Sequence, residues 1–243
     1  MTTIKVNAIE PEGGTTNLTV GLAGQNVVVG GSGGIKANTF KDAGGNTLWT
    51  SNGSGVLSSV SGFGGAQVLI SSQTASNSAS LSFTSGIDST YKEYIWECIN
   101  ITPATDTANF NFQVNASGQT GYNEVMTTTS FRISHVEDNS NTPAVTYNAG
   151  KDQAQGTAYQ TLAGYIGNDS DQCCDGELHL FNPSSTTYVK HWSAEFNAYD
   201  ASDWFLNHYI GGYINTTAAI TQIDFKFSSG NIASGTIKMY GVK

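Results

Sequence analysis

The sequence has little charge, few cysteines and no long apolar run. Only 12% of its 243 residues are charged, about half of the share that is usual in globular proteins. The 10 basic residues are scattered singly, and the formal net charge is −9. Without a Lys/Arg cluster to neutralise phosphates, we expect no nucleic-acid partner, and the same lack argues against docking on anionic lipid.

No apolar stretch is long enough to cross a membrane as a helix. The longest runs are short, such as Val27–Val29 and Val68–Ile70, whereas a span needs roughly 20 apolar residues. The opening residues MTTIKVNAIEPEGG contain no apolar region of the kind found in signal peptides. The sequence therefore predicts neither membrane insertion nor a secretion signal, and exit from a cell would need another route, such as lysis.

The cysteines are few and irregularly placed. Cys98 stands alone, and Cys173 and Cys174 are adjacent, so the pattern does not match a disulfide framework. It also lacks the CxxC pairs of a zinc site. We interpret all three as reduced thiols, with Cys98 in a strand.

Glycine pairs set residues 1–65 apart from the rest of the chain. Short pieces between these pairs alternate apolar with polar residues, as Ile4, Val6 and Ala8 do, which predicts short β-strands. The segment contains few large apolar side chains, so we expect it to fold against copies of itself or against a partner. A disordered linker is the alternative for this composition.

Residues 66–243 alternate apolar and polar residues repeatedly, with Gly, Asn, Asp, Ser and Pro between the alternating pieces. This pattern predicts a β-sandwich of jelly-roll type over 66–243, following a Gly-rich β attachment segment over 1–65, in an all-β chain. A turn or two of helix between Asp152 and Ile166 is the one helical expectation, and Gly156 and Gly164 interrupt it. The clearest alternating sets are Ala79-Leu81-Phe83, Tyr94-Trp96-Cys98, Phe110-Phe112-Val114, Phe131-Ile133, Tyr188-Lys190-Trp192-Ala194-Phe196, Ile223-Phe225-Phe227 and Ile237-Met239.

The four histidines, His135, His179, His191 and His208, show no metal-binding spacing such as HxH or HExxH. His179 and His191 have the opposite parity to the apolar residues around them. We therefore expect both side chains to face solvent or an interface, and not to converge on a site.

Other patterns of catalytic sites are also missing. The run Gly30–Gly34 lacks the GxSxG spacing of a nucleophile elbow and the Lys of a P-loop. Paired carboxylates for glycoside hydrolysis can come from distant positions. The candidates are Glu93, Glu97, Glu195 and Asp203, although nothing in the sequence marks them.

The acidic loop 168–177 resembles a calcium loop only in part. An EF-type loop would need Asp or Asn and then Gly where Cys173 and Cys174 stand. A solvated turn is the simpler interpretation, and calcium stays open. The possible oxygen ligands are Asp169, Asp171, Asp175 and Glu177. We assign no catalytic, cofactor-binding or metal-binding residue and expect no cofactor.

Aromatic residues give the stronger functional signal. Trp192, Tyr199, Trp204, Phe205 and Tyr209 lie within one short segment. We predict a loop there whose Tyr199, Asp200, Asp203 and Trp204 could stack on and hydrogen-bond to a sugar or a protein. The alternative is that these aromatic side chains pack in the core and along its edges.

Several stretches resemble a known family. The opening MTTIKVNAIEPEGGTTNLTVG is similar to the start of tail-fibre-like and virion structural proteins of marine bacteriophages. The later match covers most of residues 70–243 and resembles the C-terminal domain of those proteins. It is carried by SSQTASNSASLSFTSGIDSTYKEYIWECINITPATD, LHLFNPSSTTYVKHW and IDFKFSSGNIASGTIKMYGVK.

The resemblance implies a non-enzymatic virion protein, assembled in the host cytoplasm and released by lysis. It would be a homotrimeric short fibre or decoration protein on the tail or capsid. Its N-terminal segment would attach to other virion proteins, and its sandwich would be displayed outward, where it could contact a host-surface glycan or protein. Two alternatives remain, a carbohydrate-binding receptor-binding protein and a glycan depolymerase. The depolymerase needs a cleft with two carboxylates.

Overall fold

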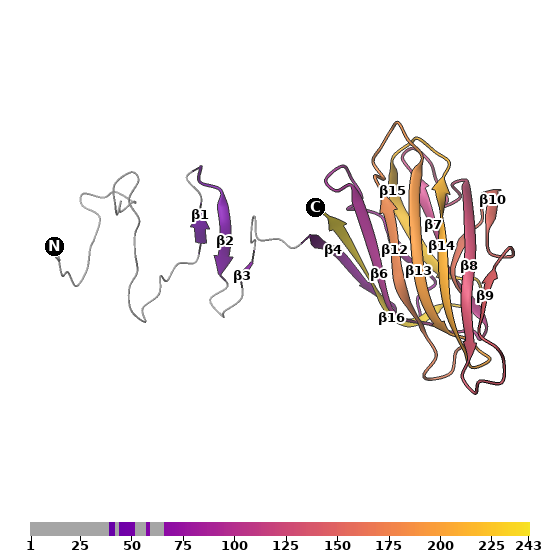
Figure 1. Cartoon of the computed structure of the whole chain (residues 1–243). Coiled ribbons are helices and arrows are strands. Elements are labelled where there is room, and N and C mark those ends of the chain that lie inside the picture. Colours follow the sequence, from indigo (N-terminus) through magenta and orange to yellow (C-terminus); the bar gives the residue numbers. More distant parts are fainter. Residues whose placement is uncertain (1–38, 42–43, 52–56, 59–65) are drawn as a thin grey trace, which may run out of the picture. The chain divides into compact units, whose positions relative to one another are not determined.

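A computed structural model describes residues 39–41, 44–51, 57–58 and 66–243 (Figure 1). The chain divides into two units, residues 1–63 and 64–243. In the first unit, β1 (Thr39–Lys41), β2 (Thr47–Ser51) and β3 (Leu57–Ser58) form an antiparallel sheet. Phe40 stacks on Trp49 across β1 and β2, with ring centroids 4.1 Å apart. Most of the predicted attachment segment, including the strand expected at Ile4–Ala8, lies outside the described residues.

The second unit contains a nine-stranded antiparallel sheet. Its strands follow the order β10-β8-β14-β13-β12-β6-β16-β4, and β9 also pairs with β8. β9 and β10 therefore lie along one edge of the sheet and β4 along the other (Figure 1). The strands are β4 (Gln67–Thr74), β6 (Glu93–Pro103), β8 (Met126–Val136), β9 (Ala144–Tyr147), β10 (Gln153–Gly156), β12 (Cys174–Phe181), β13 (Lys190–Tyr199), β14 (Trp204–Ile214) and β16 (Ile232–Val242).

A smaller sheet of four antiparallel strands completes the second unit. Its order is β11-β7-β15-β5, from β5 (Leu81–Phe83), β7 (Ala108–Ala116), β11 (Gln160–Ile166) and β15 (Ile220–Phe227). The core lies between the two sheets, which is the arrangement of a β-sandwich. The all-β prediction is confirmed for the described residues, which contain no helix of any kind and hence none that could span a membrane.

The expected helical turn between Asp152 and Ile166 is wrong, because this segment forms β10 and β11. Gly156 and Gly164 disfavour a helix. Pairing with β8 and β7 supplies backbone partners to the segment instead.

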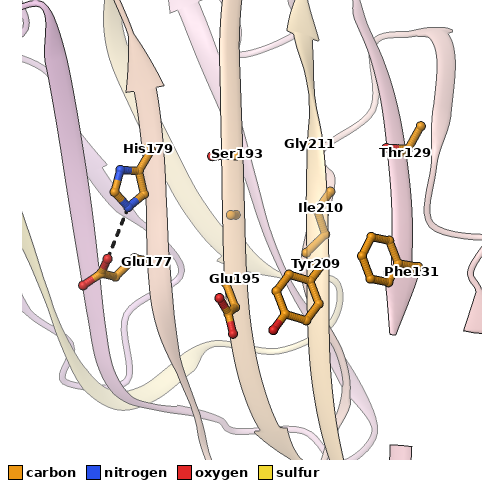
Figure 2. A pocket seen from close by; sticks show the side chains of 10 residues that line it. Thr129, Phe131, Glu177, His179, Ser193, Glu195, Tyr209, Ile210 and Gly211 are labelled. Atoms are coloured by element: carbon orange, nitrogen blue, oxygen red, sulfur yellow. Dashed lines mark hydrogen bonds and ion pairs between the residues drawn. The ribbon is translucent and has the colours of Figure 1, made fainter. Parts of the chain in front are cut away.

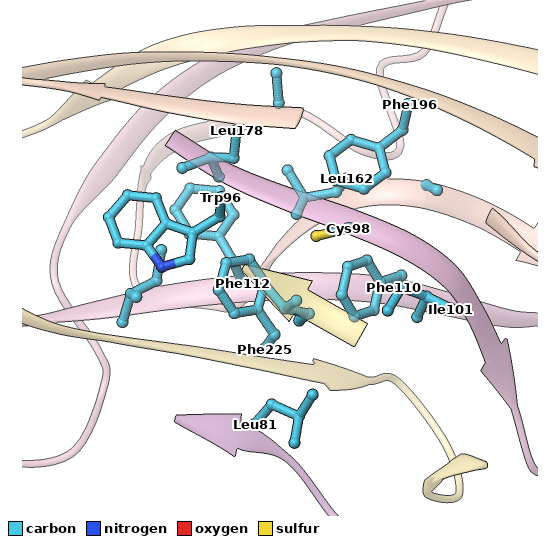
Figure 3. Close-up of a cluster of buried hydrophobic side chains, with 14 of the residues drawn as sticks. Leu81, Trp96, Cys98, Ile101, Phe110, Phe112, Leu162, Leu178, Phe196 and Phe225 are labelled. Atoms are coloured by element: carbon cyan, nitrogen blue, oxygen red, sulfur yellow. The ribbon is translucent and has the colours of Figure 1, made fainter. Parts of the chain in front are cut away.

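Aromatic rings fill the space between the sheets (Figure 3). Phe225 of β15 lies among Trp96 of β6 and Phe110 and Phe112 of β7, with ring centroids 5.9–6.4 Å apart. All four side chains are fully buried. The predicted alternation in these three strands is confirmed, since the residues at every second position face the core.

The cysteines belong to the nine-stranded sheet or lie next to it. Cys98 lies in β6, as predicted, and Cys174 begins β12. Both are buried, Cys173 is partly buried, and all three are free. Burial raises the pKa of Cys98 and of Cys174 well above that of an ordinary thiol, so both stay protonated at neutral pH.

Strand β8 is oriented opposite to the prediction. Phe131 and Ile133, expected in the core, are 40% and 37% exposed, whereas Thr128, Ser130 and Ser134 are buried. The edge strand of the small sheet, β11, packs on β13 and β14. The first residue of β11, Gln160, accepts a hydrogen bond from the hydroxyl of Thr128 at 2.8 Å. The inner side of β8 therefore meets polar partners, which its polar residues suit.

A buried carboxylate links the small sheet to the segment before β11. Asp224 is 3% exposed and accepts hydrogen bonds from Ser82 and, at 2.8 Å, from the hydroxyl of Tyr159. Removing a donor leaves a buried charged acceptor short of a partner, so we expect Tyr159→Phe to lower the free energy of unfolding by about 2 kcal/mol. Urea unfolding measures this change. The exposed Tyr188 provides the control, because Tyr188→Phe should change stability very little.

Candidate functional site

The outer face of the nine-stranded sheet, which points away from the core, carries a continuous row of cross-strand partners. Three glutamates stand next to one another in this row, on β6, β12 and β13. Aligned like charges on neighbouring strands destabilise a sheet unless other groups balance them. In strand order, the row consists of Lys238, Glu97, Glu177, Glu195, Tyr209, Phe131 and Tyr147.

Each glutamate of the row has its own partner. The ammonium of Lys238 lies 3.3 Å from a carboxylate oxygen of Glu97. Nε2 of His179 lies 3.2 Å from Glu177, and the side-chain amide of Asn207 donates to Glu195 at 3.1 Å. These partners hold three carboxylates side by side on an exposed surface.

A groove of about 460 Å³ crosses the outer face over β12, β13, β14 and β8. The groove exists because Ser193 and Gly211 are cross-strand partners. A small side chain on one strand faces a residue without a side chain on the other, so the space that larger side chains would fill stays open. Figure 2 shows Glu177 and His179 on one side of the groove and Phe131 on the other, with Glu195 and Tyr209 between them. A neighbouring hollow of about 400 Å³ shares Gly211 and lengthens the depression along the strands.

Two stacked rings form an apolar platform in the groove. The ring centroids of Phe131 and Tyr209 are 5.2 Å apart, and the ring planes differ by 14°. Interaction with the carboxylate of Glu195 on the neighbouring strand raises the pKa of Tyr209. The groove thus joins a flat apolar surface to carboxylate and imidazole groups, a combination that suits a ligand with an apolar face and hydroxyl groups.

The prediction for the histidines is right in one respect and wrong in another. His179 and His191 do lie on the outer face, His179 partly buried and His191 exposed. His179 nevertheless converges with other groups, because its Nδ1 lies 2.6 Å from Glu93 while its Nε2 contacts Glu177. It therefore lines the groove as a positioned group held between two carboxylates.

The four candidate carboxylates for hydrolysis do not converge on one site, although Glu97 and Glu195 lie in the same row on either side of Glu177. Only Glu195 lines the groove. Glu93 bonds to His179, and Glu97 bonds to Lys238 and Tyr240. Asp203 accepts from the hydroxyl of Tyr199 at 3.1 Å, at the end of β13.

The acidic loop 168–177 is also divided. Glu177 belongs to β12 and faces the groove, and Asp175 accepts a hydrogen bond from the backbone N–H of Asn100 at 2.7 Å. Within the ranges that the structure describes, no three His, Cys, Asp or Glu side chains are placed to hold a metal ion.

The aromatic segment is part core and part surface. Trp192 is buried in the core. Asp200 shapes the turn between β13 and β14, since its carboxylate accepts the backbone N–H groups of Ser202 and Trp204. Tyr199 and Phe205 line a separate outer-face hollow of about 370 Å³. Sequence reasoning identified Tyr209 but missed Phe131, because it placed Phe131 in the core.

Comparisons of the chain with protein-family models, with curated protein sequences and with solved structures find no match. The interpretation of the groove therefore depends on its own geometry.

Proposed function

We propose that the chain is a non-enzymatic virion surface protein whose β-sandwich binds a host-surface glycan in the outer-face groove. The observation that carries the glycan part is the stacked pair of Phe131 and Tyr209 beside Glu177, His179 and Glu195. An aromatic ring packs well against the C–H face of a sugar, and carboxylates accept hydrogen bonds from its hydroxyl groups.

The exposure of the carboxylates favours binding over hydrolysis. Glu177 and Glu195 are both exposed on an open sheet face. Glycoside hydrolases keep their general acid in an apolar environment that holds its proton. The groove offers neither carboxylate such a pocket, so it is suited to recognition without bond cleavage.

The virion location is supported by the resemblance of the opening residues and of the stretches in 70–243 to marine phage structural proteins. On this proposal the protein is a homotrimeric short fibre or decoration protein on the tail or capsid, attached through residues 1–65 to other virion proteins. Cryo-electron microscopy of intact virions should locate residues 1–65 in contact with the particle. A protein that is monomeric and missing from every particle would contradict this part of the proposal.

We further propose that the sandwich is a jelly roll with two insertions. Without β8–β10 and without the β13–β14 hairpin, eight strands remain, in two sheets ordered β4-β16-β6-β12 and β5-β15-β7-β11. Numbered along the chain, these sheets read 1-8-3-6 and 2-7-4-5, which is the strand order of a jelly roll. Both insertions extend the large sheet at the β12 side, and they supply most of the groove.

Removing the phenol ring from the platform tests the groove. We first identify, on a glycan array, the glycans to which the wild-type protein binds. For these glycans we expect Tyr209→Ala to lower the affinity by about tenfold or more, since a stacking surface is lost. Tyr188→Ala is the matched control, because Tyr188 is an exposed tyrosine that lines none of the hollows described above. If Tyr209→Ala binds the same glycans with the affinity of the wild type, the groove is excluded as the binding site.

A further inference from the structure

A separate hollow of about 260 Å³ lies on the opposite side of β8, at the end of the sandwich where β13 turns into β14. We call it the cationic hollow. Arg132 lines it from β8, Tyr165 lines it from β11, Ser202 lines it from the turn, and Trp204 lines it from the start of β14. Arg132 follows Phe131 in the strand, so successive side chains point to the two faces of the sheet. The cationic hollow and the groove are therefore separate sites.

A bulge in β11 places Tyr165 in this hollow. The pairing of β11 with β7 shifts register between Ala163 and Ile166, and Tyr165 has a φ of 63°. Its N–H donates to the side chain of Asn109 at 3.1 Å, and its carbonyl accepts from the N–H of Ala201 at 3.0 Å. Positive φ is rare for a bulky residue, and a bulge that redirects a side chain is typical of functional sites.

Strain of the same kind recurs around the cationic hollow. Thr107, which also lines it, has a φ of 58°. Asp203, between Ser202 and Trp204, has a φ of 63°. Backbone strain is retained where the surrounding contacts impose it, and here two of the residues that line one small space, Thr107 and Tyr165, are strained.

Two cations meet at the ring of Tyr165. The guanidinium of Arg132 lies 5.5 Å from the ring centroid, and the ammonium of Lys151 lies 4.7 Å from it. None of the ion pairs among the described residues involves either cation. Burial and the charge of Arg132 lower the pKa of Lys151. In a chain with a net charge of −9, these two cations form a local cluster of positive charge, and Asp200, which lines the same hollow, forms no ion pair with either of them.

The rest of the lining limits which anion fits. Asp200 is the one carboxylate there, and its Oδ1 accepts the N–H groups of Ser202 and Trp204 at 2.8 and 2.9 Å. Its negative charge disfavours a multiply charged anion. The hydroxyl groups of Thr107 and Ser202 and the rings of Tyr165 and Trp204 offer hydrogen bonds and apolar walls, which a sugar ring can use.

We propose that the cationic hollow binds an acidic sugar through its singly charged carboxylate or sulfate group. The guanidinium of Arg132 supplies a planar pair of donors for the oxyanion. Lys151 does not line the hollow, but its ammonium lies 4.7 Å from the centroid of the Tyr165 ring and adds a second positive charge nearby. The rings of Tyr165 and Trp204 pack against the sugar. This site goes beyond the groove, uses different residues, and recognises a charge that the groove with its glutamates would repel.

Calorimetric titration of the full chain tests the proposal. The probes are methyl glucuronide and glucose 6-sulfate, with methyl glucoside and inorganic sulfate as comparisons. We expect at least one acidic sugar to bind about tenfold or more tightly than both comparisons, because the site needs the charge and the ring together. Equal affinity for inorganic sulfate, or no binding of either acidic sugar, would overturn the proposal.

Substitutions at Arg132 assign the binding to this hollow. Arg132→Gln should reduce the affinity for the acidic sugar about tenfold or more, and Arg132→Lys should give an intermediate loss, because it keeps the charge without the planar pair of donors. The control is Lys226→Gln, since Lys226 stacks over Tyr159 at 3.9 Å, away from the hollow. Full affinity in both Arg132 variants would overturn the proposal. Binding of neutral glycans in the groove does not use Arg132, so the two proposals can fail separately.

Discussion

Replacing Phe225 with alanine is expected to lower the free energy of unfolding by about 3–5 kcal/mol, the range for a large aromatic residue removed from a core. Phe225 is fully buried, and its ring contacts rings of both sheets: Phe83, Phe110 and Phe112 of the small sheet and Trp96 of the large one. These neighbours belong to three strands, β5, β6 and β7, that are fixed in the two sheets, so the sandwich can close only part of the resulting cavity.

Chemical unfolding followed by tryptophan fluorescence measures this loss, because Trp96 and Trp192 are both buried in the core. Phe205→Ala is the matched control. Phe205 is 51% exposed on the outer face, so its removal should change stability by about 0.5 kcal/mol or less. Similar losses in the two variants would show that the core is not centred between the two sheets as described.

Acidification from pH 7 to pH 4 is expected to remove about 3 kcal/mol of stability through His208. His208 is 1% exposed, and its Nε2 accepts the backbone N–H of Gly164 at 3.3 Å, which requires the neutral ring. Burial, Arg132 and Lys151 lower its pKa from 6.5 to about 4. The unfolded chain takes up the proton below pH 6.5 and the folded chain only below about pH 4. Stability therefore falls between these two values.

Unfolding measured between pH 4 and pH 7 tests this dependence in the wild type and in His208→Gln. Between pH 7 and pH 4, His208→Gln should lose about 3 kcal/mol less free energy of unfolding than the wild type does. This difference does not depend on the stability of the variant at pH 7. Carboxylates that titrate in the same range affect both proteins alike and cancel in the comparison. His191→Gln, at an exposed position, should retain the full wild-type loss. Parallel pH profiles of the wild type and His208→Gln would contradict this role.

The sandwich core was predictable because the alternation of apolar residues has a direct physical meaning. Trp96, Phe112 and Phe225 each sit in a run where every second residue is apolar, and each such run forms a strand whose apolar side chains face the core. In β7 the polar residues between them, such as Gln113, are buried as well. Strand β8 was not predictable in this way. Both faces of β8 carry apolar as well as polar residues, so the pattern does not show which face is buried. The buried face depends on how far the four-stranded sheet extends beneath the nine-stranded one.

The register between neighbouring strands brings the residues of the groove together. The residue pattern of a single strand does not predict this register. Parity correctly predicted that His179 points outward, but its pairing opposite Ser193, and the pairing of Ser193 with Gly211, follow from the order β12-β13-β14. The same holds for the cationic hollow. The bulge at Tyr165 and the approach of Lys151 to its ring have no signal in the local sequence.

The crystal structure of the full chain in complex with an oligosaccharide that it retains on an array tests the central claim most directly. Binding without cleavage predicts an intact saccharide in the groove, with one sugar ring packed on the Phe131–Tyr209 platform and hydroxyl groups bonded to Glu177 or Glu195. A saccharide bound elsewhere on the sandwich, or a cleaved product in the groove, would contradict it.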